Sequence, residues 1–209
     1  MTFSGPKTLA ERDRGWLAGP FTPQELRQRN GPLWNPNPRF ALRQGAKTRL
    51  IDDFSYYSTN ATVAQGEKLN LGGVDEVISM AAAFMQCASG QWMELESLEG
   101  RSVKIVRRKD WEDKKIELMG RTLDLKSAYR QLGVASADSW AAIVAVFNQV
   151  AGAPAFFESQ GLPFGATASV LAFNWMSRLL KKAIGFLLHI MSGVYFDDFP
   201  MIEVAGPVH

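Results

Sequence analysis

Two aspartates stand side by side in an otherwise apolar run near the C-terminal end of the chain, GVYFDDFPMIE at residues 193–203. The apolar runs on either side have the length of short β-strands, and the two residues between them have the spacing of a two-residue hairpin loop. Neighbouring carboxylates repel each other, and burial would force them towards protonation. The doublet therefore indicates either ordinary turn chemistry or a hairpin that presents carboxylates to a cation.

The rest of the chain mixes strand-like and helix-like patterns. Helices are expected at TPQELRQR, over residues 73–89, and for about twenty residues after Gly165. The apolar stripe of this last helix comprises Val170, Phe173, Met176, Leu179, Leu180, Ala183 and Leu187. Strands are expected from Thr48 to Phe54, at Gln91–Leu95 and Val103–Arg107, before Asp124, in WAAIVAVF, and on both sides of the aspartate doublet. This order predicts an α+β fold.

Composition bounds the class of protein. The chain has 209 residues, of which 46% are hydrophobic and 21% charged, which fits a globular protein with one core. Its single cysteine, Cys87, excludes an internal disulfide and a two-cysteine metal knuckle, so we expect an intracellular protein without assigning a compartment. No segment resembles a signal peptide or a membrane span, so no membrane partner is expected.

Charge is unevenly distributed along the chain, although the formal net charge is only +2. Residues 1–49 contain nine Lys and Arg against three Asp and Glu, whereas residues 50–100 contain one against eight. A basic N-terminal part favours a polyanionic ligand such as nucleic acid or a triphosphate, although an ordinary solvated surface would have the same composition.

The carboxylates at the ends of two predicted strands suggest a metal site. Asp124 ends one strand, and Asp197 and Asp198 lie at the hairpin of another. Mg²⁺ prefers carboxylate oxygens, and a pair of such ions about 4 Å apart can support in-line phosphoryl transfer. Because Asp52-Asp53 is a second doublet in this chain, adjacency alone does not decide between a metal site and turn chemistry.

Several motifs, in order, resemble those of reverse transcriptases. LDLKSAYRQL, QGLPFGATASVLAFN and VYFDDF resemble the first, second and third palm motifs of this family, and KTRLIDDFSYYSTN resembles the fingers strand of its retrotransposon-type members. The likeness covers about residues 40–203. It implies a palm, an antiparallel sheet with packed helices, together with fingers, and two-metal transfer of a nucleotide from a dNTP to a primer on an RNA or DNA template.

The resemblance also assigns roles to residues. Asp124, Asp197 and Asp198 match the catalytic metal ligands, with the carbonyl of Leu125 as an additional ligand, for two Mg²⁺ ions or alternatively Mn²⁺. In the nucleotide-binding part, Tyr129 matches the aromatic gate against a 2′-hydroxyl, Arg49 and its helper Lys47 match triphosphate contacts, and Phe164 and Gly165 match the loop that supports the nucleotide and template.

The resemblance further predicts how the chain is divided. It assigns residues 41–209 to the fingers and a C-terminally incomplete palm, with an insertion at 90–121. Residues 1–40 are expected to form an N-terminal arm, because residues 15–40 contain five of the ten prolines and so predict extended or looped backbone. The thumb and ribonuclease H domain of the family are expected to be absent. The sequence leaves the oligomeric state open.

Two other functions stay open at this point. A truncated or decayed fragment would bind nucleic acid, or nothing, without polymerising. An RNA-dependent RNA polymerase would share the palm chemistry, but such enzymes usually have a glycine before the aspartate pair and a polar residue at the gate, where this chain has Phe196 and Tyr129.

Overall fold

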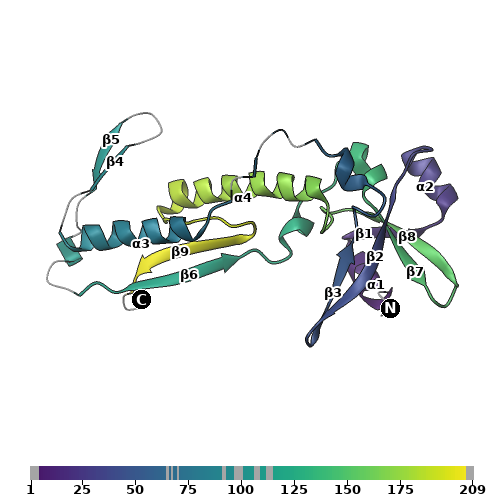
Figure 1. Ribbon diagram of the computed structural model, residues 1–209, viewed down its shortest axis with the longest axis horizontal. Coiled ribbons are helices and arrows are strands. Elements are labelled where there is room, and N and C mark those ends of the chain that lie inside the picture. Colours follow the sequence, from purple (N-terminus) through teal and green to yellow (C-terminus); the bar gives the residue numbers. More distant parts are fainter. Residues whose placement is uncertain are drawn as a thin grey trace. The chain divides into compact units, whose positions relative to one another are not determined.

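The computed structural model describes residues 5–64, 66, 68–69, 71–90, 93–96, 101–105, 109–111 and 115–205 (Figure 1). By its internal contacts the chain divides into two compact units, which are described separately. The first comprises Met1–Leu69 and Lys126–Phe173, and the second comprises Asn70–Leu125 and Asn174–His209. No helix in the described ranges is both long and apolar enough to cross a membrane.

The first unit is built on a five-stranded sheet with the strand order β1-β8-β7-β2-β3. Its strands are β1 (Leu17–Phe21), β2 (Pro36–Gln44), β3 (Lys47–Asp52), β7 (Ile143–Asn148) and β8 (Ala153–Ser159). Neighbouring strands are antiparallel except β2 and β7, which are parallel. This mostly antiparallel sheet with helices confirms the predicted α+β class.

The helices of this unit are short. They are α1 (Gly5–Asp13), α2 (Pro23–Asn30) and the 3₁₀ turns Thr59–Thr62, Ala128–Gln131 and Ser136–Ala141. Helix α2 confirms the helix predicted at TPQELRQR. It begins with a capping box, in which Thr22 and Glu25 satisfy each other's backbone N–H groups.

The core of the first unit lies on both faces of β7. Because side chains alternate along a strand, Val144 packs with Leu17 and Phe157, whereas Ile143 packs with Leu26 and Phe156. Leu17 and Leu26 come from the segment predicted to be an arm, so that prediction is wrong. The prolines there indicated loop, but Pro20 is tolerated because β1 is an edge strand of the sheet.

Strand β2 changes partner along its length. Residues 36–38 pair in parallel with β7, and residues 39–44 pair antiparallel with β3. The second half of β2 therefore forms a two-stranded ribbon with β3, which turns at Gly45. The predicted strand from Thr48 to Phe54 is confirmed within about two residues, the usual uncertainty of an element's ends.

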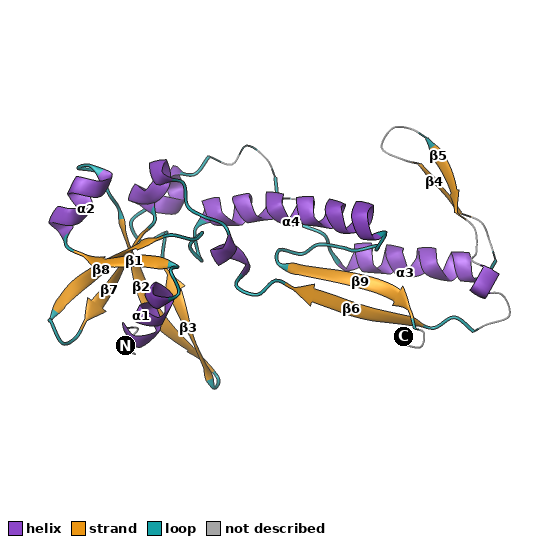
Figure 2. Ribbon diagram, turned by 180° about the vertical axis from the view of Figure 1, so that it is seen from behind, coloured by secondary structure: helices purple, strands orange, loops and turns teal. Residues whose placement is uncertain are grey.

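The second unit contains the pair β6 (Leu118–Asp124) and β9 (Asp198–Val204). Helix α3 (Val74–Ala88), which confirms the prediction for residues 73–89, contacts β9 (Figure 2). Residues 174–188 of helix α4 (Thr167–Leu188) also belong to this unit. A 3₁₀ turn, Lys109–Trp111, completes its helices in the described part of the chain.

The two strands predicted within the segment 90–121 are confirmed in part, whereas its status as an insertion stays a prediction. Strands β4 (Met93–Glu96) and β5 (Ser102–Ile105) form the expected antiparallel hairpin. The sequence also predicts a turn at Glu99-Gly100, which lies outside the described residues, as does the end of the second strand at Arg107. The last residues of the segment 90–121 belong to β6, which begins at Leu118 and pairs with β9.

The buried face of α4 differs from the predicted apolar stripe. Its most buried side chains include Ser169, Phe173 and Ser177, which follow one another at intervals of four residues. Leu179 and Leu187, by contrast, are 60% and 68% exposed. The prediction took the apolar residues as the buried face, but the buried face of the helix consists mainly of small polar residues.

Candidate catalytic carboxylates and nucleotide site

Asp124 and Asp198 lie directly opposite each other in the β6–β9 pair. The N–H of Leu125 donates to the carbonyl oxygen of Asp197 at 3.2 Å, while Asp198 and Tyr195 exchange both of their backbone hydrogen bonds. The backbone of Asp198 is thus turned away from Asp124, and the two aspartates form a non-hydrogen-bonded pair. In such pairs the side chains are on the same face, with Cβ atoms about 4.5–5.5 Å apart.

The hairpin before β9 is displaced by one residue from the prediction. Its two central residues are Phe196 and Asp197, between the paired Tyr195 and Asp198, whereas the sequence pattern placed Asp197 and Asp198 there. Phe196 has a φ of 54°, in the left-handed region that a bulky residue rarely adopts. Backbone strain of this kind is found preferentially at functional sites.

These carboxylates are unpaired within the part of the chain that the structure describes. Asp124 and Asp198 are exposed and Asp197 is half-buried, and none of the three makes an ion pair or side-chain hydrogen bond there. Like charges directly opposite each other across a strand pair destabilise it. The pair is therefore an arrangement that an added cation would stabilise.

The donor set fits Mg²⁺. No group of three or more Asp, Glu, His and Cys side chains within the described ranges forms a closed metal cluster. Mg²⁺, however, is commonly held by one or two carboxylates together with substrate phosphates, without a cage made by the protein alone. Asp124 and Asp198 place two carboxylates, which are hard oxygen donors, on one face of a strand pair, and Asp197 does not form a group of three with them.

The first unit contains the other predicted site residues. Lys47 and Arg49 alternate along β3, so both side chains point to one face of the β2–β3 ribbon. Both are exposed, and neither makes an ion pair within the described part of the chain. Their charges are thus available to an anion.

Tyr129 is buried, as a core aromatic would be. Its ring stacks on Phe173 with centroids 4.6 Å apart and meets the edge of Phe164 at 5.3 Å. Only 9% of Tyr129 is exposed, against 58% of Phe164. The structure therefore joins two residues that the resemblance assigned to the nucleotide, and it makes Phe164 the accessible member of the pair.

Gly165 approaches the chain's own backbone. Its φ of 101° is left-handed, and a Cβ atom there would lie 2.4 Å from the carbonyl oxygen of Asp52. The resemblance assigned this glycine to the loop that supports the nucleotide and template. In the structure its lack of a side chain is required by the approach of β3.

Asn60 holds the loop that contains Phe164 and Gly165. Its side-chain amide donates to the carbonyl oxygen of Gly165 at 3.1 Å, and its side-chain oxygen accepts from the N–H of Thr167 at 2.8 Å. The second bond caps the first turn of α4 from a distant segment. The sequence suggested no contact for Asn60.

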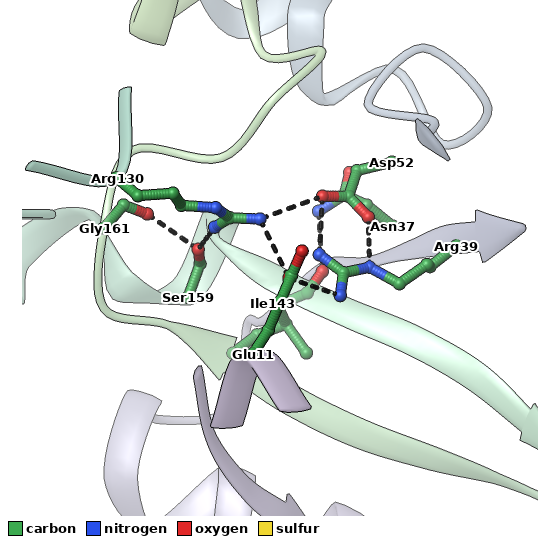
Figure 3. A network of polar contacts seen from close by, with 8 residues as sticks. All are labelled: Glu11, Asn37, Arg39, Asp52, Arg130, Ile143, Ser159 and Gly161. Atoms are coloured by element: carbon green, nitrogen blue, oxygen red, sulfur yellow. Dashed lines mark hydrogen bonds and ion pairs between the residues drawn. The ribbon is translucent and has the colours of Figure 1, made fainter. Parts of the chain in front are cut away.

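Asp52 has a different role from the aspartates of the second unit. Arg39 and Asp52 are opposite each other at the first pair of the β2–β3 ribbon, and the guanidinium binds the carboxylate in two places, at 2.5 and 2.9 Å (Figure 3). The side chain of Arg39 is fully buried. Glu11 of α1 binds its remaining nitrogen at 2.8 Å.

Arg130 completes this network from the turn after Tyr129. It donates to the hydroxyl of Ser159 at 2.7 Å and lies 3.3 Å from Glu11 (Figure 3). Burial lowers the pKa of Arg130, and attraction to the two carboxylates only partly offsets this effect. For Arg39, burial also opposes the charge, but Asp52 and Glu11 outweigh it and raise its pKa. The network therefore contains two guanidinium groups and two carboxylates, whose formal charges cancel.

Sequence reasoning missed this network. The available signal was the alternation along β3, which places Asp52 on the same side as Thr48 and Leu50, opposite to Lys47 and Arg49. A carboxylate on the inner side of a strand requires a cationic partner. Its partners come from segments far apart in the sequence, which no local pattern identifies.

Comparison with models of known protein families and with curated proteins gave no match.

Proposed function

We propose that this chain is an RNA-directed DNA polymerase of the reverse-transcriptase type, which transfers a nucleotide from a dNTP to the 3′-hydroxyl of a primer on a template. The observation that carries the proposal is the pairing of Asp124 with Asp198, with Asp197 in the adjoining turn. A purely structural hairpin would gain nothing from three unneutralised carboxylates in so short a space.

The carboxylates would hold Mg²⁺, with the carbonyl of Leu125 as a further ligand. When bound, Mg²⁺ lowers the pKa of a primer hydroxyl and neutralises charge on the leaving pyrophosphate. The chain's own contribution is a fixed separation of Asp124 and Asp198, which the antiparallel register sets. The hydrogen bond from Leu125 to Asp197 holds the turn against the end of β6.

In the first unit, the unpaired cations of the ribbon would bind the triphosphate. Arg49 can bind phosphate oxygens bidentately, and Lys47 adds a second charge on the same face. Phe164, the exposed aromatic of the loop fixed by Asn60, would contact the sugar or base of the nucleotide, supported from below by Tyr129.

Primer extension tests the proposal directly. Purified chain, an RNA template with a DNA primer, dNTPs and Mg²⁺ should give extended primer. We expect Asp124→Asn and Asp198→Asn to lower the rate by roughly 100-fold or more, the scale of losing one preorganised electrostatic group. Asp75→Asn, an exposed carboxylate at the start of α3, is the matched control and should keep full activity.

The result separates the competing functions. Extension with rNTPs in preference to dNTPs would identify an RNA polymerase instead. Binding of template-primer without extension would identify a non-catalytic nucleic-acid-binding protein. Full activity in Asp124→Asn or Asp198→Asn would exclude that residue as a metal ligand.

The choice of sugar tests Tyr129 and Phe164. Tyr129→Ala and Phe164→Ala should both relax discrimination against ribonucleotides, because the first removes the support of the second. Tyr129→Phe keeps the buried ring and should keep the discrimination. If Phe164→Ala leaves the ratio of dNTP to rNTP incorporation unchanged while Tyr129→Ala alters it, the gate is Tyr129 itself.

A further inference from the structure

A cavity of about 680 Å³ lies within the second unit, and none of the three carboxylates of the proposed active site lines it. Three segments line it: residues from Gly72 to Met80, the last turns of α4, and the chain from His189 to Val194. Its volume is within the range of small-molecule sites.

The charged side chains around this cavity are mostly cationic. Arg178, Lys181 and Lys182 project from neighbouring positions of α4, and Glu76 of α3 is the carboxylate opposite them. Positions three and four apart on a helix share a face, so the three cations reach the same space. Three Lys and Arg side chains against one carboxylate leave a surplus of two positive charges among these four residues.

The carboxylate of Glu76 neutralises one cation, Lys181, and leaves Arg178 and Lys182 uncompensated among the described residues. One of its oxygens accepts from Lys181 at 2.7 Å, and the other accepts from the N–H of Val194 at 3.4 Å. Glu76 is thereby committed to joining α3, α4 and the chain before the hairpin. Arg178, which lies over the ring of Trp175 at 5.4 Å, and Lys182 make no ion pair within the described ranges.

A hydroxyl in the lining has no partner. Ser192 is only 8% exposed, and its Oγ is buried without a hydrogen bond in the described part of the chain. Buried polar groups in folded proteins are almost always hydrogen-bonded, and an unsatisfied one is costly. Ser192 lines the same cavity as Arg178 and Lys182, and its hydroxyl can donate to an acceptor oxygen of an anion.

We propose that this cavity binds a phosphate group, from a nucleotide or from free phosphate, through Arg178, Lys182 and Ser192. A guanidinium binds two phosphate oxygens in parallel, an ammonium adds a point charge, and the hydroxyl donates to a remaining oxygen. Cations in a concave site also focus the field that attracts an anion. This site is additional to the proposed polymerase chemistry and does not depend on it.

Binding can be measured on the whole chain without template, primer or metal. Titration calorimetry with inorganic phosphate and with adenosine monophosphate should show one site per chain. Arg178→Gln and Lys182→Gln should each weaken binding by about tenfold or more, because each removes a charge-assisted hydrogen bond. Lys115→Gln, an exposed cation of the same unit outside the cavity, is the matched control and should bind as the wild type does.

Ser192→Ala gives the sharper test. It removes the unsatisfied hydroxyl, so the free protein should melt at the same or a higher temperature, while phosphate affinity should fall by about three- to tenfold. Tighter binding of adenosine monophosphate than of phosphate would assign a nucleotide, and equal affinities would assign free phosphate. No binding by the wild type, unchanged affinity in Arg178→Gln and Lys182→Gln, or an equal loss in Lys115→Gln would overturn the proposal.

Discussion

The two units of this protein treat aspartates in opposite ways. In the first, Asp52 is buried and receives a bidentate contact from Arg39, within a network of two cations and two anions. In the second, Asp124 and Asp198 stand opposite each other in the solvent-accessible end of a strand pair, without a cation in the described part of the chain.

This difference separates compensated charges from uncompensated ones. A buried charge that serves the fold must bring its counter-ion with it, because the cost of desolvation would otherwise exceed the gain. A charged side chain that binds a ligand must not already form an ion pair within the protein. Both doublets read Asp-Asp in the sequence, and only their surroundings distinguish them.

The largest expected effect comes from breaking the compensated side. Asp52→Asn leaves the fully buried guanidinium of Arg39 with one charged partner, so the free energy of unfolding should fall by about 3–5 kcal/mol. Chemical denaturation of the wild type, of this variant and of the control Asp53→Asn measures the loss of unfolding free energy. Asp53→Asn, which keeps an oxygen to accept from the N–H groups of Ser55 and Tyr56, should cost much less. Equal losses would contradict the separate roles of the two aspartates.

The next effect concerns the backbone of Asp52. Gly165→Ala should cost about 2–4 kcal/mol, because it adds a steric clash with the carbonyl oxygen of Asp52 to the strain of a left-handed residue. Gly152→Ala is the matched control, since Gly152 is also left-handed but has open space around its Cβ position. It should lose only about 1 kcal/mol. Similar melting temperatures would show that β3 can move away from the loop.

The third effect has the opposite sign. Asp198→Asn removes one of two like charges from a cross-strand pair, so the free energy of unfolding should rise by about 0.2–1 kcal/mol at low salt. Mg²⁺ should raise the melting temperature of the wild type and have little effect on the variant. A destabilised Asp198→Asn protein would place Asp198 with Asp52, among the structural charges.

The smallest effect is expected from Glu25→Gln, which changes a carboxylate that is exposed but accepts hydrogen bonds. The backbone N–H and hydroxyl of Thr22 donate to Glu25 and lower its pKa. A carboxyl with a lowered pKa in the folded state contributes stability at neutral pH, and this contribution is lost as the pH falls through that pKa. The stability difference between wild type and Glu25→Gln should therefore be present at neutral pH and disappear in acid. A difference that is constant with pH would exclude the charge as its source.

The sequence predicts the elements of this fold better than their contacts. Local patterns suffice for α2, α3 and α4, because helical spacing, and in α2 also the capping box, act within one segment. They fail for β1, where prolines indicated loop although an edge strand tolerates them, and for β8, which was not predicted at all. Membership of a sheet depends on partners elsewhere in the chain.

For the candidate site, the sequence identifies which residues carry charge but not which charges are compensated. Asp124 and Asp198 were expected on neighbouring strands, and their exact opposition follows from a register that only the structure provides. The burial of Tyr129 and the bonds of Asn60 depend on long-range packing. No spacing along the chain encodes either.

Because β2 changes partner, one end of the β2–β3 ribbon is anchored in the sheet and the other end projects from it. Up to residue 38 the strand pairs with β7, which joins it to the rest of the sheet, and from Arg39 onwards it pairs with β3 alone. A two-stranded ribbon is only marginally stable by itself, so its direction is set where it leaves the sheet. The buried pair of Arg39 and Asp52 is the first rung beyond that point. This ion pair therefore fixes the direction in which the ribbon leaves the sheet. The orientation of Lys47 and Arg49, near the turn at the other end of the ribbon, thus depends on two buried side chains.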